Sequence, residues 1–193
     1  MSFGAEILFA RGGQAEILYA DPLFRRPCLE KRYFNGRKDT VFWQAEIDAM
    51  CDLRAAGVQV PELLATDSSD CSMVMQRIEG RTLHNLMEYG HIWDCAHASR
   101  LLDRLCDQVG LAHRAGWLHL DLSPDNVVVD SGENVWLIDF ALAQRTGSAK
   151  QAKFGKKPYM PKYYWETPNE GFDWHAVGVI ADELSASLAR RTS

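Results

Sequence analysis

The stretch HLDLSPDNVVVDSGENVWLIDF, residues 119–140, joins a polar segment to two short apolar runs. The runs, residues 127–129 and 135–138, flank the turn SGEN, and this pattern predicts a β-hairpin. Asn126 stands just before the first run and Asp139 directly after the second. A hairpin would place both residues at one edge, so the spacing predicts a cluster of oxygen-bearing side chains there.

These side chains suit the transfer of a phosphoryl group. That reaction needs a carboxylate to orient and deprotonate the attacking hydroxyl, and oxygen ligands for the Mg²⁺ that bridges the phosphates. Mg²⁺ typically takes one or two carboxylates together with phosphate oxygens. Asp121 fits the base, and Asn126 and Asp139 fit the metal ligands. The alternative is a polar turn followed by a hairpin that carries incidental acids.

The same residues resemble the catalytic and metal-binding loops of the protein-kinase-like superfamily. His119-x-Asp121-x-x-x-x-Asn126 is similar to the H-R-D-x-x-x-x-N loop, and Asp139-Phe140-Ala141 is similar to D-F-G. The resemblance covers about residues 4–188 and is strongest over 117–140. It implies an enzyme that uses ATP and Mg²⁺.

Earlier residues follow in the order that this resemblance implies. Lys31 would grip the α- and β-phosphates, and Glu46 would be its ion-pair partner. Gly12 and Gly13 would cover the phosphates, and Met75 would contact adenine beside a hinge over residues 76–80. Each position also has a purely structural interpretation. Lys31 would then be a surface lysine and Glu46 a solvated helix acid, with Asp48 as the competing acid. The two glycines would form a plain hairpin turn, and Met75 would lie in a plain buried strand.

Hydrophobic periodicity predicts strands near residues 7–10, 16–19, 28–34, 58–65 and 72–78, and a helix over about 42–53 that Gly57 ends. After Gly80 the pattern becomes mainly helical. With the resemblance, this predicts an α+β, bilobal, protein-kinase-like fold. A small antiparallel β-sheet N-lobe with one helix (residues 1–77) and a truncated, minimal helical C-lobe (residues 78–193) would form one domain, with ATP between them.

Three segments near the end of the chain extend the resemblance or depart from it. Residues 172–178, FDWHAVG, resemble the kinase helix whose aspartate, here Asp173, caps backbone N–H groups of the catalytic loop. A simple helix N-cap is the alternative. The basic, Pro/Gly-punctuated stretch 141–168 predicts a long loop. Leu120 replaces the arginine of H-R-D, so we expect activity that does not depend on phosphorylation of that loop. Ser123 replaces a lysine that many Ser/Thr protein kinases carry, which loosens the assignment to protein substrates.

Composition limits which binding partners and which cellular compartment we expect for the protein. The 193 residues carry 21 Lys+Arg and 26 Asp+Glu, a net charge of −5, which gives no support to nucleic-acid binding. No stretch is apolar for long enough to span a membrane. Five scattered cysteines without a C-x-x-C pair predict reduced thiols and a cytoplasmic location. A protein delivered into a host cell through a type III secretion system would show the same features.

The N-lobe stretches EKRY, RAAGVQVP and MQRIEG are similar to small ATPases of the Bud-thirty-two type and to lipopolysaccharide sugar kinases. Together with the tail features, a chain this small resembles the minimal bacterial type III effector kinases of the HopBF type. That resemblance implies a serine/threonine kinase whose protein substrate is the host chaperone heat shock protein 90. A small-molecule or lipopolysaccharide-sugar kinase and an ATP-binding pseudokinase remain alternatives.

Overall fold

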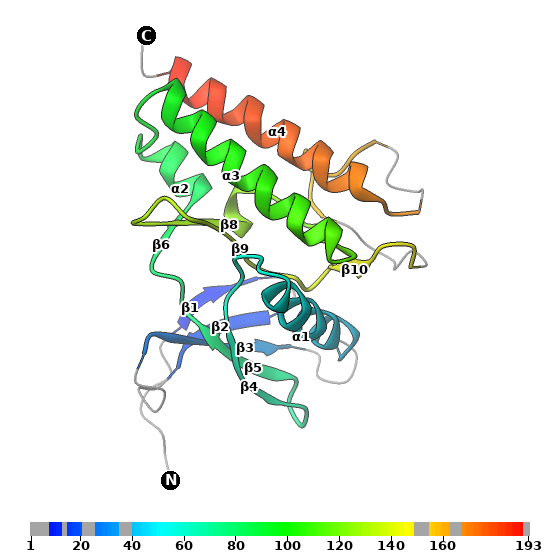
Figure 1. Cartoon of the computed structure of the whole chain (residues 1–193). Coiled ribbons are helices and arrows are strands. Elements are labelled where there is room, and N and C mark those ends of the chain that lie inside the picture. The colour runs from blue at the N-terminus through cyan, green and yellow to red at the C-terminus, as the bar shows by residue number, and fades with distance from the viewer. Residues whose placement is uncertain are drawn as a thin grey trace.

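The computed structural model of the chain describes residues 8–12, 15–20, 26–34, 40–148, 155–162 and 167–190. A sheet with one helix forms the first part, and the remaining helices and two small sheets form the second (Figure 1). The first part comprises β1 (Leu8–Arg11), β2 (Ala15–Tyr19), β3 (Cys28–Tyr33), α1 (Thr40–Ala55), β4 (Leu63–Asp67) and β5 (Ser72–Gln76). This arrangement has the mixed α+β content that the sequence predicts.

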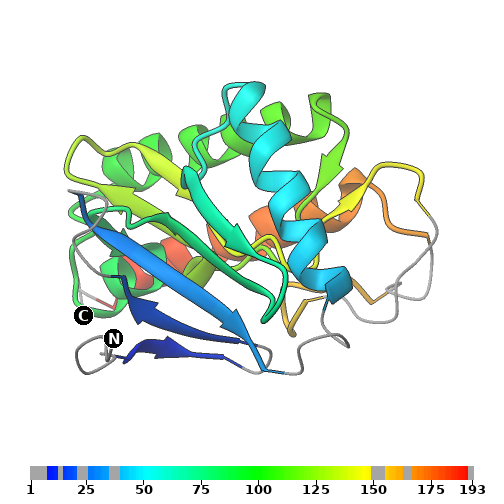
Figure 2. The same cartoon turned by 90° about the horizontal axis from the view of Figure 1, so that it is seen from below.

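The five strands of the first part form one antiparallel sheet in the order β1-β2-β3-β5-β4. In the view of Figure 2, α1 lies beside these strands. The helix buries Trp43, Ala49, Met50 and Leu53, whose spacing places them toward one side of the helix. Its end is closed by Gly57 at φ 84°, where the Val58 N–H donates to Leu53 O at 3.0 Å.

The predicted strand over residues 58–65 is only partly correct, because β4 begins at Leu63. Val58 and Val60 are buried alternately, as in a strand, yet this segment leaves the sheet. The Gln59 N–H donates to Gln108 Oε1 at 2.7 Å, and Gln59 O accepts from Leu137 N at 2.9 Å. Pro61 has no N–H for a strand ladder. The segment therefore joins the first part of the chain to the second.

The second part contains two long helices and several short elements that the periodicity did not predict. It comprises β6 (Gly80–Thr82), α2 (Leu83–Glu88), α3 (Cys95–Arg114), β7 (Trp117–Leu118), a 3₁₀ turn (Pro124–Asn126), β8 (Val127–Asp130), β9 (Val135–Leu137), β10 (Gln144–Arg145) and α4 (Glu170–Ala189). β8 and β9 are the predicted hairpin, and β6 pairs with β8. β7 pairs with β10.

The last helix differs from its sequence interpretation at one aromatic position. Val177, Ile180 and Leu184 are buried on the inner side of α4, as expected from their spacing. Trp174, which has the helical spacing of the same stripe, is nevertheless 39 % exposed, and its ring lies edge-on against the ring of His113. Among the described residues, no helix combines the length and the apolar character that crossing a membrane requires.

Candidate active site

Lys31 lies at the centre of a charged cluster between the two parts of the molecule. Its Nζ is 2.8 Å from Glu46 Oε2 and 2.8 Å from Asp139 Oδ1. Lys31 comes from β3, Glu46 from α1 and Asp139 from the end of the predicted hairpin, so packing brings together residues that are 15 and 108 positions apart. The competitor Asp48 lies instead on the exposed side of α1, where it accepts from Gln44 Nε2.

Two further groups hold the Glu46 carboxylate. The backbone N–H of Phe140 donates to Glu46 Oε1 at 3.2 Å, and the Tyr33 hydroxyl donates to Glu46 Oε2. Glu46 is 1 % exposed, so these bonds replace the water that a buried carboxylate loses. Sequence reasoning missed Tyr33, although it lies two residues after Lys31 and therefore on the same face of β3.

Attraction between Lys31 and its two carboxylate partners determines which groups of this cluster are charged. Burial alone would lower the pKa of Lys31, but Asp139 and Glu46 raise that pKa well above the ordinary value for lysine. Burial alone would raise the pKa of Asp139, but Lys31 holds that pKa below its usual value. The lysine therefore stays cationic and Asp139 stays ionised at neutral pH.

Asp121 is held beside this cluster by its own loop. The Asp121 N–H donates to His119 Nδ1 at 3.3 Å, and His119 Nε2 lies 3.1 Å from Ile138 O. The Asn126 side-chain amide donates to Asp121 O at 2.8 Å and to Asp121 Oδ2 at 3.3 Å. Burial raises the pKa of Asp121, and nearby Asp139 adds to this effect. The site thus contains one carboxylate that binds a proton more readily than an exposed aspartate does.

The oxygen donors at the hairpin edge fit a magnesium ion that is shared with phosphates. Asn126 uses its Nδ2 toward Asp121, so its Oδ1 faces the other way, and the Asp139 side chain is 41 % exposed. Within the described ranges, no group of three or more His, Cys, Asp or Glu residues could hold a metal ion. Two protein oxygens completed by phosphate oxygens are a usual magnesium arrangement.

Asp173 anchors the loop that carries Asp121. Its two oxygens accept from the backbone N–H groups of His119 and Leu120, each at 2.9 Å. His113 Nε2 lies 2.9 Å from Asp173 Oδ2, which ties α3 to α4 at the same point. Leu120 has φ 62°, a left-handed conformation that a leucine rarely adopts. The buried carboxylate therefore supports a strained loop through its backbone.

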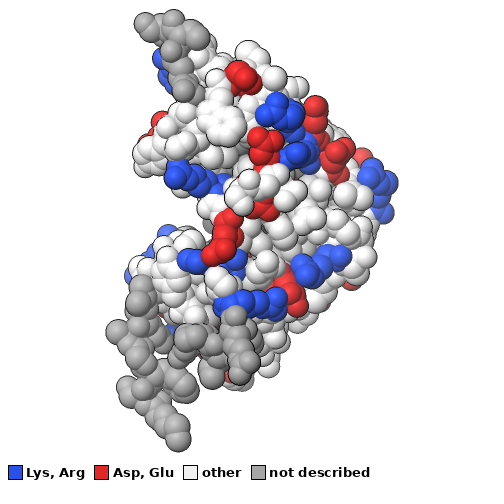
Figure 3. All heavy atoms as spheres, turned by 60° about the vertical axis from the view of Figure 1, so that its left-hand side comes forward, with Lys and Arg blue, Asp and Glu red and all other residues white. Residues whose placement is uncertain are grey.

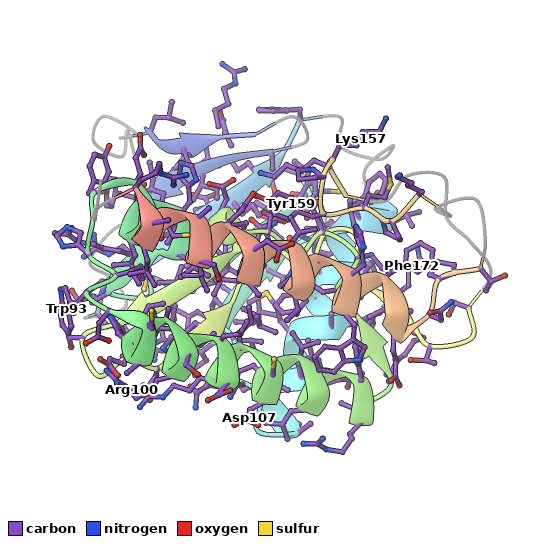
Figure 4. All side chains as sticks on the ribbon, turned by 90° about the horizontal axis from the view of Figure 1, so that it is seen from above. Trp93, Arg100, Asp107, Lys157, Tyr159 and Phe172 are labelled. Atoms are coloured by element: carbon purple, nitrogen blue, oxygen red, sulfur yellow. The ribbon has the colours of Figure 1, made fainter. Side chains whose placement is uncertain are left out.

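The segment 155–162 runs over the same loop. A Cβ at Gly155 would lie 2.9 Å from Leu120 O and 3.5 Å from Asp121 Oδ1, so the backbone passes close to the Asp121 carboxylate. Lys156 Nζ is 2.6 Å from Asp125 Oδ2. Figure 4 shows Lys157 and Tyr159 on this segment beside α4, where the Tyr159 hydroxyl donates to Glu183. The segment is thus fixed to both the loop and the helix.

The remaining predicted site residues are placed as follows. Met75 is buried in β5, opposite Leu29 of β3 and Leu63 of β4. Gly12 follows β1, and its N–H donates to Ala15 O at 2.9 Å in the turn. Gly13 lies outside the described residues. In the space-filling view the outline narrows between the sheet part and the helical part, and acidic and basic side chains alternate on that face (Figure 3).

Known proteins with similar sequences point to one enzyme family. Residues 30–189 match the family model of the protein kinase domain. The chain is 30% identical over 149 residues to the KEOPS complex subunit Bud32 of Pyrococcus abyssi, covering 72% of this chain and 64% of that protein. It is 30% identical over 113 residues to sperm motility kinase Z of Mus musculus, covering 56% of this chain and 23% of that protein.

A third relative is the probable serine/threonine-protein kinase PknB of Corynebacterium glutamicum, 25% identical over 140 residues, which are 70% of this chain and 19% of that protein. The chain thus spans less than two thirds of the length of each of these three relatives. The family model nevertheless covers most of the chain, including Lys31, Asp121 and Asp139. The chain belongs to the protein kinase domain family.

Proposed function

We propose that the protein transfers the γ-phosphate of ATP, with Mg²⁺, to a serine or threonine hydroxyl of a protein. The observation that carries this proposal is the pairing of Lys31 with both Glu46 and Asp139, close to a separately held Asp121. Similarity to serine/threonine kinases such as PknB supports a protein acceptor. The cluster supplies a fixed cation, an ionised carboxylate and a carboxylate with raised proton affinity.

In this proposal each residue has one task. Lys31, kept cationic by its two carboxylate partners, binds the α- and β-phosphates. Asn126 and Asp139 hold the magnesium ion, which neutralises charge on the phosphates when bound. Gly12 and Gly13 cover the phosphates, and Met75 contacts the adenine.

Asp121 accepts the proton of the acceptor hydroxyl. The acceptor oxygen forms a bond to the γ-phosphorus while the bond from that phosphorus to the bridging oxygen breaks, and ADP leaves. His119 and Asn126 keep Asp121 oriented throughout, through bonds to its backbone and carboxylate. A positioned base contributes about 10²- to 10⁴-fold to such a rate.

The test is phosphate transfer from γ-labelled ATP with Mg²⁺ to proteins of a eukaryotic cell lysate. We expect labelled protein with the unchanged chain, and a loss of about 100-fold or more with Asp121→Ala and with Asp139→Ala. Asp48→Ala is the matched control, because that carboxylate lies exposed on α1 and should leave the rate unchanged. An active Asp139→Ala protein would exclude the assigned metal ligand.

A parallel tube offers lipopolysaccharide and an aminoglycoside in place of protein. Label in the glycan or the drug alone would identify a small-molecule or sugar kinase. Absence of transfer in every tube, with ATP still bound, would identify an ATP-binding pseudokinase. Either result would overturn the proposed protein kinase activity.

The resemblance to the HopBF-type effectors extends the proposal to a particular acceptor. In this extension the protein reaches a host cell through a type III system and phosphorylates heat shock protein 90. Purified heat shock protein 90 should then accept label faster than casein at equal concentration. Equal labelling of both would remove the chaperone from the proposal and leave a general protein kinase.

A further inference from the structure

Helix α1 carries a second carboxylate that faces the later part of the chain. Asp52 lies six residues after Glu46 on the same helix. Its Oδ2 accepts from Trp117 Nε1 at 3.2 Å and also from Arg145 Nη2. Sequence reasoning did not single out these three residues, which lie on α1, β7 and β10. We call them the Asp52 contact.

Arg145 joins more than one element at this point. Its guanidinium lies 4.4 Å from the centre of the Trp117 ring, and its Nη1 donates to Ala115 O at 3.4 Å. Ala115 is the C-cap of α3, where the carbonyl dipoles favour a cation. Trp117 is 4 % exposed, so Asp52 also satisfies the N–H of a buried indole.

The surroundings of α1 explain why such a contact would matter. The first half of the helix borders a hollow of about 420 Å³ rather than a packed surface. Its lining includes Thr40, Gln44 and Asp48 of α1 and also Trp117 and Arg145, the two partners of Asp52. On the side of the hollow, the bond between Arg145 and Asp52 joins α1 to the later part of the chain. Beside Lys31, the hydrogen bond from the Phe140 N–H to Glu46 makes a second connection.

We propose that Asp52 is a positioning residue, which holds α1 where Glu46 meets Lys31 by joining Arg145 and Trp117. The site is then assembled without a phosphate on the segment 141–168. Asp52 already supplies an anion for the Arg145 guanidinium, whose side chain is 53 % exposed, and the neighbouring loop carries buried Leu120 rather than a cation. The effect on phosphate transfer rests on the proposed kinase function, whereas the effect on α1 does not.

The first experiment measures amide hydrogen exchange over residues 41–55 in the nucleotide-free protein. Asp52→Ala should increase exchange in this helix and leave α4 unchanged, whereas Asp52→Glu should restore protection. Asp48→Ala is the matched control, because it removes an exposed carboxylate of α1 that bonds within the helix. Equal exchange in Asp52→Ala and Asp48→Ala would overturn the proposal, even if the protein transferred no phosphate.

The second experiment separates positioning from general stability. Asp52→Asn keeps an oxygen acceptor for the Trp117 N–H and removes the charge that pairs with Arg145. It should raise the KM for ATP or lower kcat by about two- to fivefold, the range expected for one exposed ion pair, without moving the urea midpoint by more than Asp48→Ala does. Arg145→Ala should have the same effect, and the double variant should add little to it. Additive losses would contradict a shared contact.

The third experiment concerns the phosphate. Protein that mass spectrometry shows to be unmodified over residues 141–168 should transfer phosphate at its full rate from the first turnover. A lag that ends when this segment becomes phosphorylated would overturn the proposal. If the protein binds ATP but transfers none, the proposed function fails, and the exchange experiment still decides whether Asp52 positions α1.

Discussion

At the scale of single residues, the pKa of Asp121 depends on the groups that surround its carboxyl. Burial raises its pKa, whereas His119, Lys156 and the Asn126 amide lower it. A base must be ionised to accept a proton, and a carboxyl is ionised above its pKa. The acid limb of kcat/KM should therefore lie at a higher pH than for an exposed aspartate.

Lys156 provides a variant that tests this pKa. Lys156→Ala removes a cation that favours the ionised carboxylate, so the pKa of Asp121 should rise further and the acid limb should move to higher pH. Lys157→Ala, an equal loss of charge next to it, is the control. Profiles of kcat/KM against pH measure this shift. An acid limb at the same pH in Lys156→Ala as in the unchanged protein would show that Lys156 does not influence the pKa of Asp121.

Gly155 sets how closely the segment 155–162 approaches Asp121. Gly155→Ala would place a Cβ 2.9 Å from Leu120 O, so this segment or the catalytic loop must shift. We expect phosphate transfer to fall about tenfold, in line with the strain of about 1–3 kcal/mol that overpacking causes. Gly147→Ala is the control, because Gly147 has φ 81° with open space around it. Equal rates for both variants would indicate backbone strain alone.

At the scale of elements, the pairing of β6 with β8 requires a glycine. A Cβ at Gly80 would lie 2.4 Å from Val129 O and 2.8 Å from Val128 Cγ1. Gly80→Ala should therefore lower the free energy of unfolding by about 1–3 kcal/mol. Urea denaturation followed by circular dichroism measures this loss. Gly178→Ala, in open space within α4, should instead raise stability slightly, because alanine favours a helix more than glycine does. A loss in Gly178→Ala equal to that in Gly80→Ala would rule out the close approach.

At the scale of the whole molecule, the two parts share one hydrophobic core. A single buried cluster includes Met73 of β5, Leu53 of α1, Leu105 of α3 and Ile180 of α4. Because neither part can unfold without exposing this cluster, we expect one cooperative transition. Tryptophan fluorescence and far-ultraviolet circular dichroism should give coincident urea curves. Two separated midpoints would mean that residues 1–77 and 78–193 unfold independently.

Much of the fold could be predicted because the signals are local. The turn between β8 and β9, the glycine that ends α1 and the turn signals that bound β2 and β3 each depend on neighbouring residues. The spacing of His119, Asp121, Asn126 and Asp139 indicated the kinase family, which the family model confirms for residues 30–189. The catalytic roles of these residues, and of Lys31 and Glu46, stay predictions.

Contacts between distant parts of the chain could not be read from local patterns. Residues 58–62 alternate like a strand, but their backbone bonds to Gln108 and Leu137 exist only after the two parts dock. Tyr33 could be chosen as a partner of Glu46 only once α1 lay on the sheet. Asp52 and Arg145 are 93 positions apart, and many other acid–base pairs were equally compatible with their spacing. Local preferences specify elements, whereas the shared core selects which side chains meet.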